Sequence, residues 1–177
     1  MDEIELVPAD PTWPRRFEDE AARLRAIIPA DLLIALEHIG STAVPGLPAK
    51  PVIDMLATVT DLDAARARLV APLEAAGYAF WAENPETDRL FFVKGLPPSA
   101  PRRTHHLHVM AAGPAALKHI AFRDYLRDHP READRYAALK RDLARRFHHD
   151  REAYTEAKGA FIAQVLDKAD GQRGRPP

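Results

Sequence analysis

The first two thirds of the chain combine short apolar runs with turn-forming residues, a pattern typical of strands. Five strands are expected, over residues 32–36, 52–59, 78–81, 89–94 and 105–110. The pair at 78–81 and 89–94 is predicted to be antiparallel. Apolar positions at helical spacing predict a helix over 14–28, and a second helix over 62–76 is expected to end at Gly77.

After residue 113 the apolar positions follow helical spacing throughout. One helix is expected to start at Pro114, since proline suits the first helical position, and to stop before Pro130. Two further helices are predicted over 131–147 and 151–168. The fold class is therefore α+β, with a mixed sheet of about five strands, flanking helices and a C-terminal three-helix segment.

The length of 177 residues favours a single domain, predicted over 1–170. Its sheet part covers about 1–112 and its helical part about 113–170. The last residues, GQRGRPP at 171–177, predict a disordered tail.

The composition is that of an ordinary globular protein, with 46% hydrophobic and 29% charged residues. There is no cysteine, which excludes disulfides, thiolate zinc sites and cysteine nucleophiles. No apolar run is long enough to span a membrane, and the acidic start MDEIELVPAD does not resemble a secretory signal. A cytoplasmic location is expected.

A formal net charge of −1 hides an asymmetry along the chain. Residues 1–100 carry 9 Lys and Arg against 16 Asp and Glu, whereas residues 101–177 carry 16 against 10. Seven of the eight histidines also lie in the second part. Either the two parts pack on one another, or an anionic ligand meets the basic part.

The first candidate site is the loop after the strand at 32–36. Gly40 and Ser41 offer backbone amides and a hydroxyl to an anion, and Lys50 adds a positive charge. Asp54 interrupts an otherwise apolar strand, where a carboxylate is costly unless it is paired or binds a metal. Asp54 is thus either a functional residue or a structural partner that fixes the loop.

The second candidate is the strand sequence Thr-His-His-Leu-His-Val at 104–109. Strand alternation places His106 and His108 on one face, an arrangement that many metal sites use. Asp54 from a neighbouring strand would complete a set of two histidines and one carboxylate. The alternative is a pair of histidines with ordinary hydrogen bonds.

The third candidate is a pair of cations on the predicted helices. Lys158 lies at helical spacing from Tyr154 and Phe161, and Arg123 lies among apolar residues in the same way. Such a cation either extends to solvent along its aliphatic stem or reaches a buried anion.

These motifs resemble the GrpB family, also called UPF0157. The sequence EHIGSTAVPGLPAKPVID at 37–54 is similar to the long central motif of the family. Other signatures are DPTWP at 10–14, HHLHV at 105–109, FRDYLR at 122–127 and the helix with Tyr154, Lys158 and Phe161. The resemblance covers nearly the whole chain. It implies that such a domain also occurs fused behind dephospho-CoA kinase in some bacteria.

The family resembles the nucleotidyltransferase superfamily, in which a Gly-Ser pair binds nucleotide phosphates and an Asp-x-Asp on the next strand holds magnesium. By that resemblance, Gly40 and Ser41 match the first element and Asp54 the first aspartate. The second aspartate is missing, because position 56 is leucine. Either a histidine substitutes, which would shift the metal preference from magnesium toward manganese, zinc or nickel, or the transfer reaction is absent.

The resemblance implies a nucleotidyltransferase-like protein that binds a nucleotide or another phosphorylated small molecule, with metal-dependent transfer as its reaction. Asp54 is the candidate catalytic residue. The candidate phosphate-binding residues are Gly40, Ser41, Thr42, Lys50, Arg123 and Lys158. The candidate ligands of a divalent ion (Mg, Mn or Zn) are Asp54, His106 and His108.

The alternative is a non-catalytic binding or accessory domain of the same fold, which Leu56 favours. Nucleic-acid binding is disfavoured, because the basic residues are spread over three helices instead of forming one patch with stacking aromatics.

Overall fold

A computed structural model describes residues 4–98 and 100–173, and it contains one mixed five-stranded sheet in those residues. The strands are β1 (Leu33–Ile39), β2 (Ile53–Val59), β3 (Tyr78–Phe80), β4 (Arg89–Lys94) and β5 (His105–Ala111). Their order across the sheet is β1-β2-β5-β4-β3, in which β2 and β5 are parallel and the other neighbours are antiparallel. The predicted α+β class and the antiparallel β3–β4 pair are confirmed.

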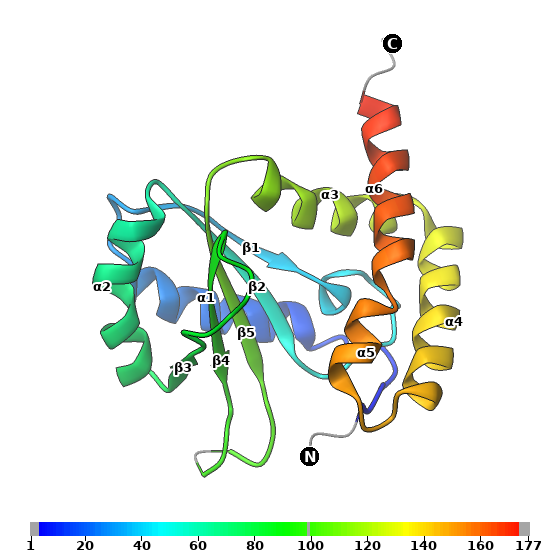
Figure 1. The fold of residues 1–177 in the computed structure, drawn as a ribbon, viewed down its shortest axis with the longest axis horizontal. Helices are drawn as coiled ribbons and strands as arrows, with labels where there is room; N and C mark the ends of the chain where they lie inside the picture. Colours follow the sequence, from blue (N-terminus) through cyan, green and yellow to red (C-terminus); the bar gives the residue numbers. More distant parts are fainter. Residues whose placement is uncertain (1–3, 99, 174–177) are drawn as a thin grey trace.

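Helices α1 (Trp13–Ile27) and α2 (Leu62–Ala75) cover one face of the sheet (Figure 1). The main core lies between them and the strands, where buried apolar side chains of both helices meet those of the sheet. A β-strand turns alternate side chains to opposite faces, so Ile53 and Met55 join this core whereas Asp54 and Leu56 point to the other face.

The C-terminal helices lie over the opposite side of the sheet (Figure 1). They are α3 (Pro114–Asp128), α4 (Pro130–Arg146), α5 (Arg151–Glu156) and α6 (Gly159–Arg173). Ala116 of α3 packs on Leu56 and Met110 of the sheet. A separate apolar cluster joins α3, α4 and α6 to the loop that contains Val44 and Leu47. The loop after β1 is therefore held between the sheet and the helices.

The prediction of one helix over 151–168 was wrong, because the structure has two helices, α5 and α6, with a break at Ala157 and Lys158. Gly159 follows the break, and glycine in a helix interior costs about 1 kcal/mol relative to alanine. Helix α6 also continues to Arg173, three residues into the range predicted as a tail. The rest of that range, 174–177, lies outside the described residues.

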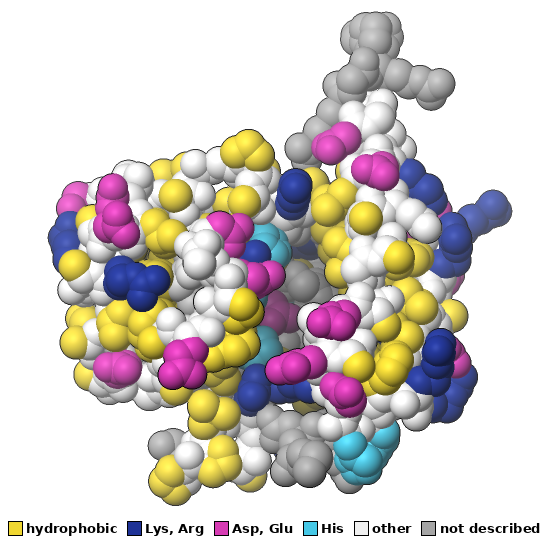
Figure 2. Space-filling model, viewed as in Figure 1, with side chains coloured by type: hydrophobic (Ala, Val, Ile, Leu, Met, Phe, Trp, Pro, Cys, Tyr) yellow, Lys and Arg dark blue, Asp and Glu magenta, His cyan; other side chains and the backbone are white. Residues whose placement is uncertain are grey.

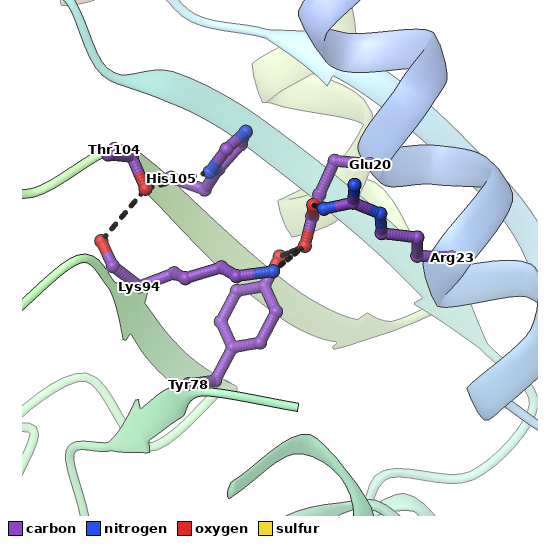
Figure 3. Close-up of polar contacts among 6 residues, drawn as sticks. All are labelled: Glu20, Arg23, Tyr78, Lys94, Thr104 and His105. Carbon is purple, nitrogen blue, oxygen red and sulfur yellow. Dashed lines mark hydrogen bonds and ion pairs between the residues drawn. The ribbon is translucent and has the colours of Figure 1, made fainter. Parts of the chain in front are cut away.

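A buried polar network joins α1 to the far edge of the sheet (Figure 3). The Glu20 carboxylate is 3% exposed and accepts hydrogen bonds from Lys94 Nζ at 2.6 Å and from the Tyr78 hydroxyl at 2.8 Å. Burial alone would raise the pKa of Glu20, but the bonds from Lys94 and Tyr78 lower it below its ordinary value. Glu20 is thus ionised and ties α1 to β3 and β4.

Among the described residues, no helix combines the length and apolar content that crossing a membrane requires.

Candidate functional site

The candidate site lies on the sheet face opposite α1 and α2. Figure 2 shows a hollow between the sheet half of the molecule and the C-terminal helices, with histidine side chains on its wall. The parallel register of β2 and β5 pairs Asp54 with His106 and Leu56 with His108. Strand alternation turns all four side chains toward the same face, as the sequence predicted for the two histidines.

Asp54 and His106 are joined by a hydrogen bond of 2.9 Å between Oδ1 and Nδ1. Burial would raise the pKa of Asp54, but the hydrogen bond from His106 and the nearby Lys50 lower it to about 2. Asp54 is therefore ionised, and His106 Nδ1 carries the shared proton. The Nε2 atom of His106 is buried and has no hydrogen-bond partner among the described residues.

Gly40 makes the turn that brings the loop against Asp54. It has a positive φ of 71°, which side-chain-bearing residues rarely adopt. A Cβ atom at this position would lie 2.6 Å from Asp54 Oδ2, so the loop approaches the carboxylate as closely as glycine allows. Ser41 follows at the start of a short 3₁₀-helix, Ser41–Ala43.

The hydrogen-bond partner of Ser41 is Lys140, a residue of α4 that the sequence did not predict for the site. Lys140 Nζ donates to Ser41 Oγ at 3.0 Å and to the Pro48 carbonyl at 2.5 Å, and the residue is 2% exposed. The signal was present in the sequence, because Lys140 lies four residues after Tyr136 and three before Leu143 on the apolar stripe of its helix.

Three lysines lie near Ser41, and each has its ammonium group over a tyrosine ring. The distances from Nζ to the ring centroid are 4.8 Å for Lys140 over Tyr136, and 5.4 and 4.5 Å for Lys50 and Lys158 over Tyr154. Such contacts stabilise a cation on the ring face. Among the described residues, none of the three lysines forms an ion pair.

Burial and mutual repulsion lower the pKa values of these lysines. The pKa falls to about 7 for Lys50 and for Lys140, in each case through burial first and then through neighbouring cations that include Lys158. The pKa of Lys158 is lowered as well, again mainly by burial. The charge of Asp54 acts on all three lysines and opposes these shifts. Lys50, Lys140, Lys158 and Ser41 are called the lysine cluster below.

Two residues predicted to bind phosphate lie outside the lysine cluster. The Thr42 hydroxyl is buried and shares a hydrogen bond of 2.9 Å with His38 Nε2. Arg123 is 7% exposed and donates to Glu37 at 2.6 Å, to Asp124 at 2.7 Å and to the His38 carbonyl at 2.8 Å. Nε and Nη1 of Arg123 thus have acceptors within the protein, and the bonds to Glu37 and His38 hold α3 on the end of β1.

His108 contacts aromatic rings and one cation. Its ring centroid is 4.8 Å from that of Phe91 and 5.6 Å from that of His119, and Arg89 Nη1 lies 3.4 Å from its Nδ1. Burial lowers its pKa to about 3, so the imidazole is neutral. Within residues 4–98 and 100–173, no three His, Asp or Glu side chains are arranged to hold a metal ion. Asp54, His106 and His108 share a face without forming such a set.

The family model described as GrpB protein matches residues 3–168. A UPF0157 protein of Pseudomonas aeruginosa is 51% identical over 95% of this chain and 68% of its own length. The crystal structure of conserved protein GrpB from Enterococcus faecalis superposes with a TM-score of 0.85 at 33% identity, covering 97% of this chain and all of that one. A dephospho-CoA kinase of Mycobacterium tuberculosis is 33% identical over 93% of this chain, which corresponds to 45% of that enzyme.

Proposed function

This chain belongs to the GrpB family. From that premise and the charges of the lysine cluster, we propose that the chain binds a phosphorylated small molecule, nucleotides included. We further propose that it transfers a nucleotidyl or phosphoryl group from that molecule. The observation that carries the proposal is the lysine cluster, with three largely buried lysines that lack ion pairs among the described residues. Uncompensated buried charge is costly, and a phosphate group would relieve that cost.

The lysine cluster, Gly40 and the Asp54–His106 pair each have a role in this proposal. Ser41 and the backbone at Gly40 bind phosphate oxygens, and the three lysines neutralise the charge of the transferred group. Asp54 is ionised beside these cations, and His106 holds its orientation through the 2.9 Å bond. In the proposed transfer, Asp54 takes the proton of an acceptor hydroxyl or water whose oxygen forms the new bond to phosphorus. The bond to the leaving phosphate breaks in the same step, and the lysines stabilise the negative charge of that leaving group. The side chain of Asp54 is 30% exposed, so a ligand can reach it.

A divalent cation stays a prediction. Asp54 and His106 do not complete a three-ligand set with His108, so the protein side chains of the described region do not by themselves fit the metal. A cation at this place would take further ligands from the bound phosphate. Binding of phosphate to the lysine cluster is therefore proposed without any step that needs the metal.

A thermal-shift panel tests the proposal. The full chain is heated with inorganic pyrophosphate, triphosphate, sugar phosphates and nucleotides, each with and without Mg²⁺, Mn²⁺ or Zn²⁺. A ligand at one hundred times its Kd stabilises the folded state by about 2.7 kcal/mol, which moves the melting temperature by several degrees. We expect such a shift with at least one phosphorylated compound. No shift with any of them would overturn the proposal.

The second candidate function is a non-catalytic binding or accessory domain, as the likeness to part of a dephospho-CoA kinase suggests. It is favoured by Leu56, which occupies the place of a second carboxylate opposite His108. Phosphorus NMR of the best ligand with wild-type protein and with Asp54→Asn separates the two. A transferase consumes the ligand and loses that turnover in Asp54→Asn, whereas an accessory domain leaves the ligand unchanged in both samples.

The lowered pKa values of Lys50 and Lys140 predict two opposite pH trends. Both lysines titrate near pH 7 when folded, against an ordinary lysine pKa of 10.5. An anion needs them protonated, so we expect affinity for sulfate, whose charge is constant, to fall at least about tenfold between pH 6 and pH 8. The unfolded chain binds more protons above pH 7, so these lysines make the free energy of unfolding of the free protein rise toward pH 10.5.

Calorimetric titrations in two buffers measure the sulfate affinity and the proton uptake, and denaturant unfolding measures the stability. Sulfate affinity that does not change over this range would contradict the assignment of the two lysines to the anion site.

A further inference from the structure

An aromatic surface continues from the Asp54–His106 pair toward the edge of the sheet. The Phe91 ring centroid lies 5.2 Å from that of His106 and 4.8 Å from that of His108. The Trp81 ring meets Phe91 edge-on at 6.0 Å. The backbone N–H of Trp81 donates to the Phe91 carbonyl, so the two residues are paired at the end of β3 and β4 and share the face that carries the histidines. Trp81 and Phe91 are called the aromatic wall below.

The aromatic wall is accessible and lies beside the phosphate site. Trp81 is 46% exposed, so a ligand in solution can reach its ring. From Phe91, direct contacts lead through His106 to Asp54 and from Asp54 to Gly40, next to Ser41 of the lysine cluster. One ligand of moderate length can therefore contact both surfaces.

The charges near the aromatic wall decide which end of a ligand lies there. The segment after Trp81 carries the exposed residues Glu83, Glu86 and Asp88, of which the last two pair with Arg89 at 3.2 and 3.1 Å. This acidic rim repels phosphate, whereas the lysine cluster attracts it. A ring without negative charge suits the aromatic wall, because aromatic side chains bind flat rings by stacking.

We propose that the ligand carries a flat aromatic ring together with its phosphate, as a nucleotide does and a sugar phosphate does not, and that the ring stacks on Trp81 and Phe91. This inference rests on the proposed function, since the lysine cluster binds the phosphate end. The acidic rim also makes a long nucleic-acid strand a poor ligand, so the chemical class is the mononucleotide.

Tryptophan fluorescence reports directly on the aromatic wall. The chain has two tryptophans, and Trp13 is 2% exposed in the core, so a ligand in solution can reach Trp81 alone of the two. Full-length protein is titrated with purine and pyrimidine nucleoside diphosphates, with ribose 5-phosphate and with inorganic pyrophosphate. We expect saturable quenching by nucleotides and none by the other two compounds.

Calorimetry of variants completes the test. We expect Trp81→Ala to weaken nucleotide binding about tenfold and to leave pyrophosphate binding unchanged, whereas Trp81→Phe retains most of the nucleotide affinity. Leu117→Ala, which removes another exposed apolar side chain (53% exposed), is the matched control and should change neither.

Three further outcomes are distinguishable. If nucleotide and pyrophosphate bind equally well and Trp81→Ala weakens neither, the aromatic wall is overturned while the proposed function stands. If Trp81→Ala weakens the binding of both compounds equally, the substitution disturbs the structure of the site and does not remove a specific contact with the ring. The inference is then also overturned. If no phosphorylated compound binds wild-type protein, the proposed function itself fails.

Discussion

Replacing Glu20 with alanine is expected to lower the free energy of unfolding by about 3 kcal/mol or more. The substitution leaves the Lys94 ammonium and the Tyr78 hydroxyl without the carboxylate that they share inside the structure (Figure 3). Breaking one side of a buried ion pair typically costs about 3–5 kcal/mol, and the low end applies because Lys94 keeps 22% of its side chain in solvent. Denaturant unfolding measures the effect.

The exposed Glu18 on the same helix provides the control, since Glu18→Ala should change the stability by no more than about 0.5 kcal/mol. The dependence of the free energy of unfolding on acidic pH gives an independent check. Because the pKa of Glu20 is lowered from 4.5, its contribution is present above that value and is lost as the pH falls through the lower folded pKa. Equal stability of Glu20→Ala and wild type at pH 7 would contradict the role of the network.

Replacing Gly40 with alanine is expected to damage both stability and the site. Gly40 has φ 71° and ψ −169°, a backbone region that is essentially restricted to glycine and costs another residue about 1–3 kcal/mol. The added methyl group must also displace the Asp54 carboxylate, 2.6 Å away. We expect a total loss of about 2–3 kcal/mol together with weaker ligand binding. Unfolding and calorimetry on the same variant measure the two effects.

The variant Gly46→Ala separates the effect of backbone strain from that of the contact between the new methyl group and Asp54. Gly46 has a similar φ of 74°, but a Cβ atom there meets nothing within 4 Å. Gly46→Ala should therefore cost the strain of about 1–2 kcal/mol and leave ligand affinity intact. If the two variants lose the same stability and keep the same affinity, the close approach of the loop to Asp54 has no functional meaning.

The sheet was predictable because its strands carry local signals. Apolar runs bounded by proline and glycine marked all five strands, and alternation in HHLHV placed His106 and His108 on one face. The pairing of Asp54 with His106 follows from the parallel register of β2 and β5, which depends on the path of the chain through α2, β3 and β4. No local pattern contains that register.

The lysine cluster was predictable in part. Lys50 and Lys158 were found from their surroundings in the sequence, whereas Lys140 was missed, because a lysine on an amphipathic helix normally reaches solvent. What buries Lys140 is the packing of α4 on the loop at Ser41 and Pro48, a long-range contact. The contact of Arg123 with Glu37 was not predictable for the same reason, since the two residues lie 86 positions apart in the sequence.

We propose that the lysine cluster binds the anionic part of the ligand. Isothermal titration of inorganic triphosphate into wild-type protein and into Lys140→Met tests it most directly, with Lys118→Met as the control, because that exposed lysine of α3 carries the same charge. Circular dichroism confirms that each variant is folded. We predict at least tenfold weaker binding to Lys140→Met and unchanged binding to Lys118→Met. Equal affinity of the wild type and folded Lys140→Met would contradict the claim.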